Sequence, residues 1–263
     1  MQRLRADLAQ PDVPTGRDER TFALVAAIAQ ISRVTGARAV ATGQGLMPPL
    51  EGAARERLLG RYLEVSPTIV RVVDAPRERR AAFTGTDEQY RDAVADWHRA
   101  RVAKYVDALT SRAGDVGFLV WGDPAFYDST IRIVDQIAEL LPVEVDVIPG
   151  ISSLQVLAAR HRLVLHEVGR PLHVTTGRAL GEAVAVGHDN LVVMLNRDVA
   201  PPELDDWQIW WGGNLGTANE RLGAGRVGEV RTEIDAARTR LRETAGWMMD
   251  VYLLRRERPG RGA

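Results

Sequence analysis

The sequence contains no cysteine among its 263 residues. A thiolate nucleophile, an iron–sulfur cluster and a cysteine zinc site are therefore excluded, and disulfides cannot indicate the redox compartment. The sequence also lacks an apolar run near the roughly 20 residues that cross a bilayer. Its start lacks the order of charged, apolar and small residues found in a secretory signal. We therefore expect a cytoplasmic protein with no membrane partner.

The sequence has no large excess of either charge sign, because it contains 34 lysines and arginines and 35 aspartates and glutamates. This balance gives no support to binding of a nucleic-acid backbone, so we expect no nucleic-acid partner. The last residues, 257–263, are charged and rich in glycine. Such a composition is typical of a disordered, solvated tail.

Motifs of two large enzyme classes are missing as well. The sequence has neither the Gly-x-Ser-x-Gly elbow of serine hydrolases nor the Gly-Lys-Ser/Thr string of phosphate-binding loops. Asp198, Asp205 and Asp206 form no metal-ligand pattern, because no histidine shares a helix face with them at ligand spacing. We expect these aspartates to be solvated loop acids, and we expect no metal.

An apolar run over 119–121 breaks at Gly122-Asp123-Pro124, and a helix-like pattern follows. Pro124 fixes its own φ and pushes Asp123 out of the helical region, which points main-chain groups outward. An ordinary Asp-Pro turn that closes a strand explains the string about equally well. Tyr127 and the polar residues after it favour a ligand-binding corner, because they bring an aromatic face and hydrogen-bonding groups to the same helix start.

A second corner of the same design lies within 145–155. A β-branched run ends at Pro149-Gly150, and Ser152 and Ser153 open the next helix. Gly150 allows a ligand or another backbone to approach closely, while the two hydroxyls lie beside free helix amides. Helix capping accounts for one serine but not for the Pro-Gly in front of it. Two such corners at the carboxyl edge of one parallel sheet would form a crevice for a small polar ligand.

The alternation of strand-like and helix-like segments predicts an α/β fold with right-handed parallel βαβ units in its first part. Short connections in the second part favour a mixed sheet. The expected strands are 37–41, 68–73, 118–121, 143–148, 172–175, 191–195, 207–211 and 247–254. The expected helices are 21–35, 51–63, 86–109, 129–141, 152–160, 179–186 and 234–244. The expected organisation is an atypical segment at 1–66, α/β domains at 67–166 and 167–256, and a tail at 257–263.

The two corners, with the string Thr175-Thr176-Gly177-Arg178, resemble the tetrapyrrole methylase family. Further matching strings are Asp96-Trp97-His98, Trp210-Trp211-Gly212, Leu215-Gly216-Thr217 and Gly246-Trp247-Met248-Met249-Asp250. The agreement extends over about residues 70–256. The resemblance implies two α/β domains of the tetrapyrrole methylase type, with a parallel sheet in the first and a mixed sheet in the second. It also implies a homodimer that binds S-adenosylmethionine between its domains.

Carried over position by position, the resemblance implies a set of site residues. The cofactor shell would contain Gly122, Asp123, Phe126, Ser152, Ser153, Leu195 and Gly216, with Trp121, Met194 and Thr217 adjacent. The implied reaction transfers a methyl group to C1 of precorrin-5, with water-dependent loss of the C20 acetyl group as acetate. The planar guanidinium group of arginine suits the carboxylates of this acidic tetrapyrrole, because it can donate two parallel hydrogen bonds. The substrate-binding candidates are Tyr127, Arg160 and Arg178, with Arg132 and Arg162 as further arginines. His161 is a candidate base for the deacylation.

The opening of the chain departs from the family pattern. Members begin with a strand that runs into a Gly-x-Gly-x-Gly-Asp-Pro loop, whose nearest counterpart here is 39–48. One hypothesis is a shifted reading frame or start in the gene, which sequencing of the upstream DNA would test. If the segment is genuine, the first strand of the sheet is missing or replaced. The alternatives are an active precorrin methyltransferase, an inactive relative that only binds the cofactor, and a methyltransferase acting at another ring position.

Overall fold

The computed structural model describes residues 39–44, 68–73, 84–110, 116–118, 120, 122–246 and 248–256. They belong to two compact units, an amino-terminal unit that ends at Ser152 and a carboxyl-terminal unit that begins at Ser153. Several expectations lie outside the described residues: the helices at 21–35 and 51–63, the residue Trp121 and the tail at 257–263.

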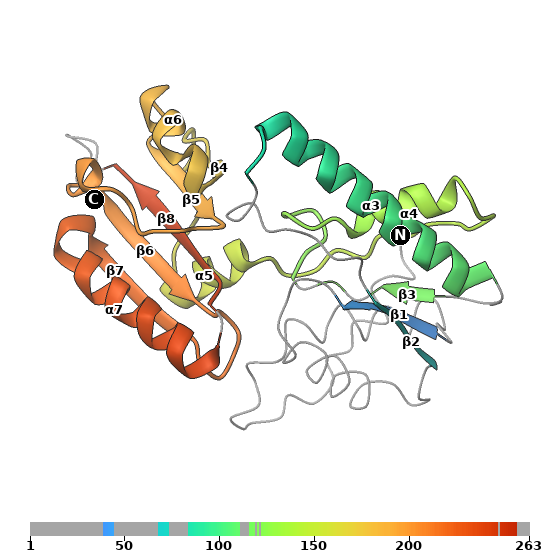
Figure 1. The fold of residues 1–263 in the computed structure, drawn as a ribbon. Helices are drawn as coiled ribbons and strands as arrows, with labels where there is room; N and C mark the ends of the chain where they lie inside the picture. The colour runs from blue at the N-terminus through green and yellow to red at the C-terminus, as the bar shows by residue number, and fades with distance from the viewer. Residues whose placement is uncertain are drawn as a thin grey trace. The chain divides into compact units, whose positions relative to one another are not determined.

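The amino-terminal unit contains a three-stranded sheet in the order β2-β1-β3 (Figure 1). The strands are β1 Ala39–Gln44, β2 Thr68–Val73 and β3 Val116–Phe118. Both neighbours of β1 pair with it in parallel, which confirms the parallel sheet expected for the first part of the chain. A strand from within 1–66 therefore occupies the centre of this sheet.

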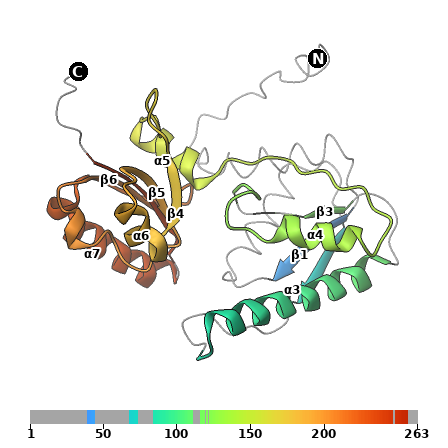
Figure 2. The same ribbon diagram turned by 90° about the horizontal axis from the view of Figure 1, so that it is seen from above.

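Two helices pack beside this sheet and against each other (Figure 2), namely α3 Asp87–Thr110 and α4 Thr130–Ala138. A capping box starts α3: the Gln89 amide donates to the Thr86 hydroxyl at 3.2 Å, and the Thr86 amide donates to the Gln89 side chain at 2.8 Å. The core of this unit is formed by Val70, Val72, Val102, Tyr105, Leu109, Ile133 and Ile137. Among the described helices of the chain, none combines the length and apolar character that crossing a bilayer requires.

The strand expected at 143–148 is absent, so that expectation was wrong. Residues 142–152 have no regular secondary structure. Val143 and Val147 are each 46% exposed, and no strand within the described part of the chain pairs with them. β-branched residues favour a strand only when a neighbouring pleated surface covers them. Without such a neighbour among the described strands, the run is a connection without regular secondary structure.

The carboxyl-terminal unit contains a five-stranded mixed sheet in the order β4-β5-β8-β6-β7, in which β4 and β5 are parallel and the other pairs are antiparallel. The strands are β4 His173–Thr176, β5 Asn190–Met194, β6 Gln208–Gly213, β7 Arg221–Arg226 and β8 Asp250–Arg255. The mixed sheet is confirmed. Sequence reasoning missed β7, because this edge strand has three glycine and alanine residues and little apolar alternation.

Helices cover both faces of this sheet. The helical segments are α5 Ser153–His161, η3 Gly177–Ala179, α6 Leu180–Ala185, η4 Pro202–Leu204 and α7 Val227–Ala245. Alternate residues of the strands face opposite sides: Leu191 and Tyr252 join the core with α6 and α7, whereas Val192 and Val251 join the core with α5. The chain therefore divides before α5, earlier than the boundary expected at 166, because α5 packs on the second sheet.

Candidate functional site

The two corners found in the sequence touch each other in the amino-terminal unit. The Gly150 amide donates to Oδ2 of Asp123 at 2.8 Å, and the Ala125 amide donates to Oδ1 of the same carboxylate at 2.8 Å. A Cβ added at Gly150 would lie 2.2 Å from the Gly122 carbonyl oxygen, a distance that no side chain can occupy. Gly122 itself has φ +77°, a left-handed conformation that favours glycine. The corners therefore form one joined bend.

Asp123 holds this bend together rather than offering its side chain to a ligand. Both carboxylate oxygens already accept a main-chain hydrogen bond, and charge-assisted bonds of this kind are among the stronger ones. Around the bend, three large side chains are exposed to solvent. Phe126 is 37% exposed, Tyr127 is 49% exposed and Ile151 is 42% exposed. Ser152 is buried and Ser153 begins α5.

The other expected cofactor residues lie at one end of the sheet in the carboxyl-terminal unit. Met194 ends β5, and the next residue, Leu195, is exposed with φ +53°. A left-handed conformation costs a non-glycine residue about 1–2 kcal/mol, and such strain is concentrated at functional sites. Gly216, with φ +77°, lies in the turn after β6. The residue pairing Met194 opposite Val251 and Gly213 opposite Asp250 puts these ends side by side.

The turn after β6 is held by a shared carboxylate. Oε2 of Glu220 accepts the Gly216 amide at 2.7 Å, and Oε1 accepts Nε of Arg160 at 2.8 Å. The Thr217 hydroxyl donates to the Asn214 carbonyl at 2.8 Å. Arg160, expected on substrate carboxylates, thus has an internal partner on this turn. It links α5 to the turn that carries Gly216.

His161, the candidate base, is also engaged inside the carboxyl-terminal unit. Its Nε2 lies 3.0 Å from the main-chain carbonyl oxygen of Trp211. A carbonyl oxygen can only accept, so Nε2 carries the hydrogen in the neutral ring and Nδ1 carries the lone pair. The contact ties the last residue of α5 to β6, which gives His161 a structural function.

Arg178 and Tyr127, like the further arginines Arg132 and Arg162, have no side-chain partner among the described residues. Within that part of the chain, neither Arg178 nor Tyr127 makes an ion pair or side-chain hydrogen bond, and both are exposed. Arg178 follows Gly177 at the end of β4. A Cβ at Gly177 would lie 3.2 Å from Oδ1 of Asn196, so Arg178 lies next to the Leu195 loop.

A buried ionic network behind this loop was missed by sequence reasoning. Nε of Arg238, on α7, lies 3.0 Å from Oδ2 of Asp250, on β8. The same oxygen accepts the Trp211 indole hydrogen at 2.8 Å. Burial raises the pKa of the Asp250 carboxyl, whereas Arg238 and Trp211 act in the opposite direction. The only sequence signal was the string that ends in Asp250.

A Gly-x-Gly-x-x-Gly string occurs at Gly223, Gly225 and Gly228. It marks a dinucleotide loop when a parallel strand precedes it and the helix amides are open. Here β7 is an antiparallel edge strand, and the Val227 and Gly228 amides donate to the carbonyls of Trp207 and Asp205. The string therefore forms a structural strand-to-helix bend.

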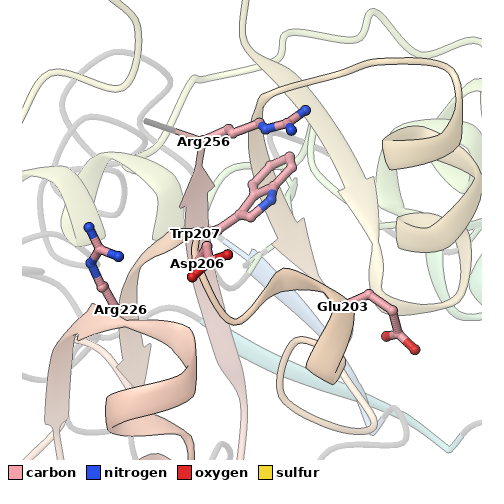
Figure 3. Close-up of a pocket in the computed structure, with 5 residues that line it drawn as sticks. All are labelled: Glu203, Asp206, Trp207, Arg226 and Arg256. Atoms are coloured by element: carbon pink, nitrogen blue, oxygen red, sulfur yellow. The ribbon is translucent and has the colours of Figure 1, made fainter. Parts of the chain in front are cut away.

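A cavity of 260 Å³ lies beside the turn between β7 and α7 (Figure 3). It is lined by Glu203, Asp206, Trp207, Arg226 and Arg256. These residues lie where β7 and β8 end, whereas Leu195 and Gly216 lie at the opposite ends of the strands. None of the cofactor-binding or substrate-binding candidates from the sequence lines this cavity, and Asp206 is one of the acids expected in solvated loops.

Comparisons with known proteins agree with the motifs. The family model for tetrapyrrole (corrin/porphyrin) methylases matches residues 16–231, a range that includes most of the segment at 1–66. A precorrin-6A synthase [deacetylating] from Sinorhizobium sp is 45% identical over 175 residues, which cover 64% of this chain and 67% of that protein.

Solved structures have the same fold. A cobalamin synthesis related protein, CobF, from Corynebacterium diphtheriae matches with a TM-score of 0.70 and 33% identity, covering 86% of this chain and 90% of that one. A cobalt precorrin-4 methyltransferase, CbiF, matches with a TM-score of 0.52 and 13% identity, covering 87% of each chain, and this likeness concerns the fold alone. With a family model that extends over most of its length, this chain belongs to the tetrapyrrole (corrin/porphyrin) methylases.

Proposed function

We propose that this protein is an S-adenosylmethionine-dependent precorrin methyltransferase that methylates C1 of precorrin-5, takes up one water molecule to release the C20 acetyl group as acetate, and so forms precorrin-6A. The observation that carries the proposal is the joined bend at Gly122 and Gly150, in a chain 45% identical to a precorrin-6A synthase [deacetylating]. A bend fixed by its own carboxylate presents main-chain groups in one geometry, which suits a small metabolite.

The residues around the bend suit a cofactor with an aromatic ring and polar groups. Phe126 and Ile151 supply exposed apolar surface, while Asp123 fixes the bend. In the other unit, Leu195 and Gly216 supply left-handed backbone that points main-chain groups away from the regular sheet. The cofactor supplies an electrophilic sulfonium methyl group, so the protein has to align the reacting atoms and exclude water from the line of methyl transfer, without a covalent enzyme intermediate.

For the substrate, we propose Arg178 and Tyr127 as binding residues. The Arg178 guanidinium is exposed, and its planar fork matches a carboxylate. Arg160 would reach a substrate only by sharing its charge with Glu220. His161 supports α5 and is not assigned to the chemistry. We further propose that the enzyme acts as a cytoplasmic homodimer, as the family resemblance implies.

Two measurements test this function. Calorimetric titration with S-adenosylhomocysteine should give one site per chain. Incubation with precorrin-5 and S-adenosylmethionine, followed by mass spectrometry, should give a product with one added methyl group and no C20 acetyl group. Binding without turnover would indicate a relative that only binds the cofactor. An added methyl group with the acetyl group retained would indicate another ring position.

A further inference from the structure

The loop after β5 has an unusual backbone. Leu195 adopts φ +53° although it is not glycine, and its side chain is 55% exposed. An unsupported loop would relax to a more extended conformation, because the left-handed one is unfavourable for leucine. Some other part of the protein must therefore hold the loop in this shape.

The support comes from Arg238 on α7. Its NH2 group donates to the Arg197 carbonyl at 2.9 Å and lies 3.5 Å from the Asn196 carbonyl oxygen. Asn196 adds to this support, since its side-chain amide donates to the carbonyls of Val193 at 3.2 Å and Asp250 at 3.3 Å. The two residues that follow Leu195 are thus fixed through their carbonyls and one side chain.

The buried ion pair of Arg238 and Asp250 is better explained by the positioning of the loop than by a gain in stability. The Arg238 side chain is 3% exposed and the Asp250 side chain is 2% exposed. A buried ion pair is often no more stabilising than well-packed apolar residues of the same size. The buried positions of α7 on either side of Arg238, Ile234 and Leu241, are apolar and pack in the same core. An apolar residue would therefore suit this position if stability were all that mattered.

We infer that Arg238 is a positioning residue for cofactor binding: fixed by Asp250, it holds the loop 195–197 in the strained shape that presents Leu195 and its main-chain groups to the cofactor. This inference rests on the proposed function, in which Leu195 belongs to the cofactor shell. Arg238 itself is buried and does not contact the cofactor.

The test compares the full-length protein with three variants. Arg238→Lys keeps a positive charge, but one ammonium group cannot reach Asp250 and the loop carbonyls together. Arg238→Met with Asp250→Asn removes both charges while an amide oxygen still accepts the Trp211 indole hydrogen. Arg170→Lys is the matched control. Arg170 is also buried, pairs with Asp189 and donates to two main-chain carbonyls, but at the opposite end of β5.

Affinity for S-adenosylhomocysteine is measured by calorimetry, and hydrogen exchange of the peptide covering 194–199 is measured without ligand. We expect Arg238→Lys and the double variant to raise Kd by about tenfold or more, because a misplaced binding group is costly, and to speed exchange in this peptide. Arg170→Lys should leave both quantities unchanged. If Arg238→Lys does not fold, the double variant gives the same comparison.

Two results would overturn the inference. Equal ligand affinity in the wild-type protein and a folded Arg238 variant would do so while leaving the proposed function intact. Equal loss of affinity in the Arg170→Lys control would assign the effect to general destabilisation. Failure of the proposed function is seen separately, in the wild-type titration, as an absence of binding to S-adenosylhomocysteine.

Discussion

At the scale of single residues, glycine and aspartate make the bend that the sequence pointed to. Gly150 is required because its amide reaches Asp123 while its missing side chain leaves room for the Gly122 carbonyl. The sequence predicted that the two corners would lie together at the ends of parallel strands, and they are in contact although the strand expected at 143–148 is absent. It could not predict that Asp123 joins them, because the contact spans 27 positions and depends on two loop conformations.

Replacing Gly150 with alanine should disrupt the bend. The added Cβ would lie 2.2 Å from the Gly122 carbonyl oxygen, and relieving such an overlap costs about 1–3 kcal/mol. Thermal unfolding and titration with S-adenosylhomocysteine measure the result, with loss of affinity exceeding the loss of stability. Gly181→Ala is the control, because nothing lies within 4 Å of a Cβ there. A Gly150→Ala protein that binds like wild type would refute the site.

His161 should prove dispensable for the chemistry. Its Nε2 hydrogen bonds to the Trp211 carbonyl, so His161→Gln, which can also donate from a terminal amide, should preserve the ratio of acetate release to methyl transfer. His161→Ala should lower the free energy of unfolding by about 1 kcal/mol with the same ratio. Quantifying acetate and methylated product in one reaction decides the matter. A selective loss of acetate release in both variants would restore His161 as a base.

At the scale of secondary structure elements, the sequence predicted buried strands well and exposed ones poorly. The apolar runs of β5 and β8 are buried on both faces, so their positions were found to within a few residues. The run at 143–148 is also rich in β-branched residues but has no neighbouring strand among the described residues, and β7 has a neighbour but little apolar content. In both segments, the presence or absence of a strand follows from a pairing partner rather than from composition.

The start of β4 should make stability depend on pH. The rings of His173 and His188 stack at 4.0 Å, and burial followed by the charge of His188 lowers the pKa of His173. The unfolded chain therefore binds more protons than the folded chain chiefly between the lowered pKa of folded His173 and the ordinary histidine value of about 6.5. This contribution to stability is present above about pH 6.5 and is lost as the pH falls through the pKa of the folded state.

Chemical unfolding at about pH 8 and about pH 5.5 measures this effect, since histidine titrates between these values. His188→Asn removes the second charge, so its stability should fall less between the two conditions. The same pH dependence in wild type and His188→Asn would show that the stacked pair contributes nothing.

At the scale of the whole molecule, residues proposed for cofactor binding occur in each compact unit. The amino-terminal unit contains the bend, and the carboxyl-terminal unit contains the Leu195 and Gly216 ends of its sheet. Sequence reasoning pointed to both regions through motifs, and their part in cofactor binding stays a prediction. That reasoning missed Arg238 and Asp250, because α7 reads as a helix of mixed charge and the burial of one arginine depends on the sheet beneath it.

S-adenosylhomocysteine should therefore stabilise the protein against unfolding. A ligand present at about 100 times its Kd adds about 2.7 kcal/mol to the free energy of unfolding when only the folded state binds it. Thermal unfolding at increasing ligand concentration provides the measurement. The Gly150→Ala variant should show a much smaller shift, and an identical shift in both proteins would contradict the assignment of the bend to the cofactor.

The hydrogen bond from Gly150 to Asp123 also has a genetic consequence. The Asp123 side chain accepts this bond, whereas the donor is the main-chain amide of residue 150, so a Cβ at residue 150 weakens the bond by displacing the bend and a change at Asp123 weakens it by altering the acceptor. The combination of Asp123→Asn with Gly150→Ala should therefore cost less than the two separate changes added together. Once either residue has been lost from a lineage, selection on the other is relaxed, so the two should tend to disappear together.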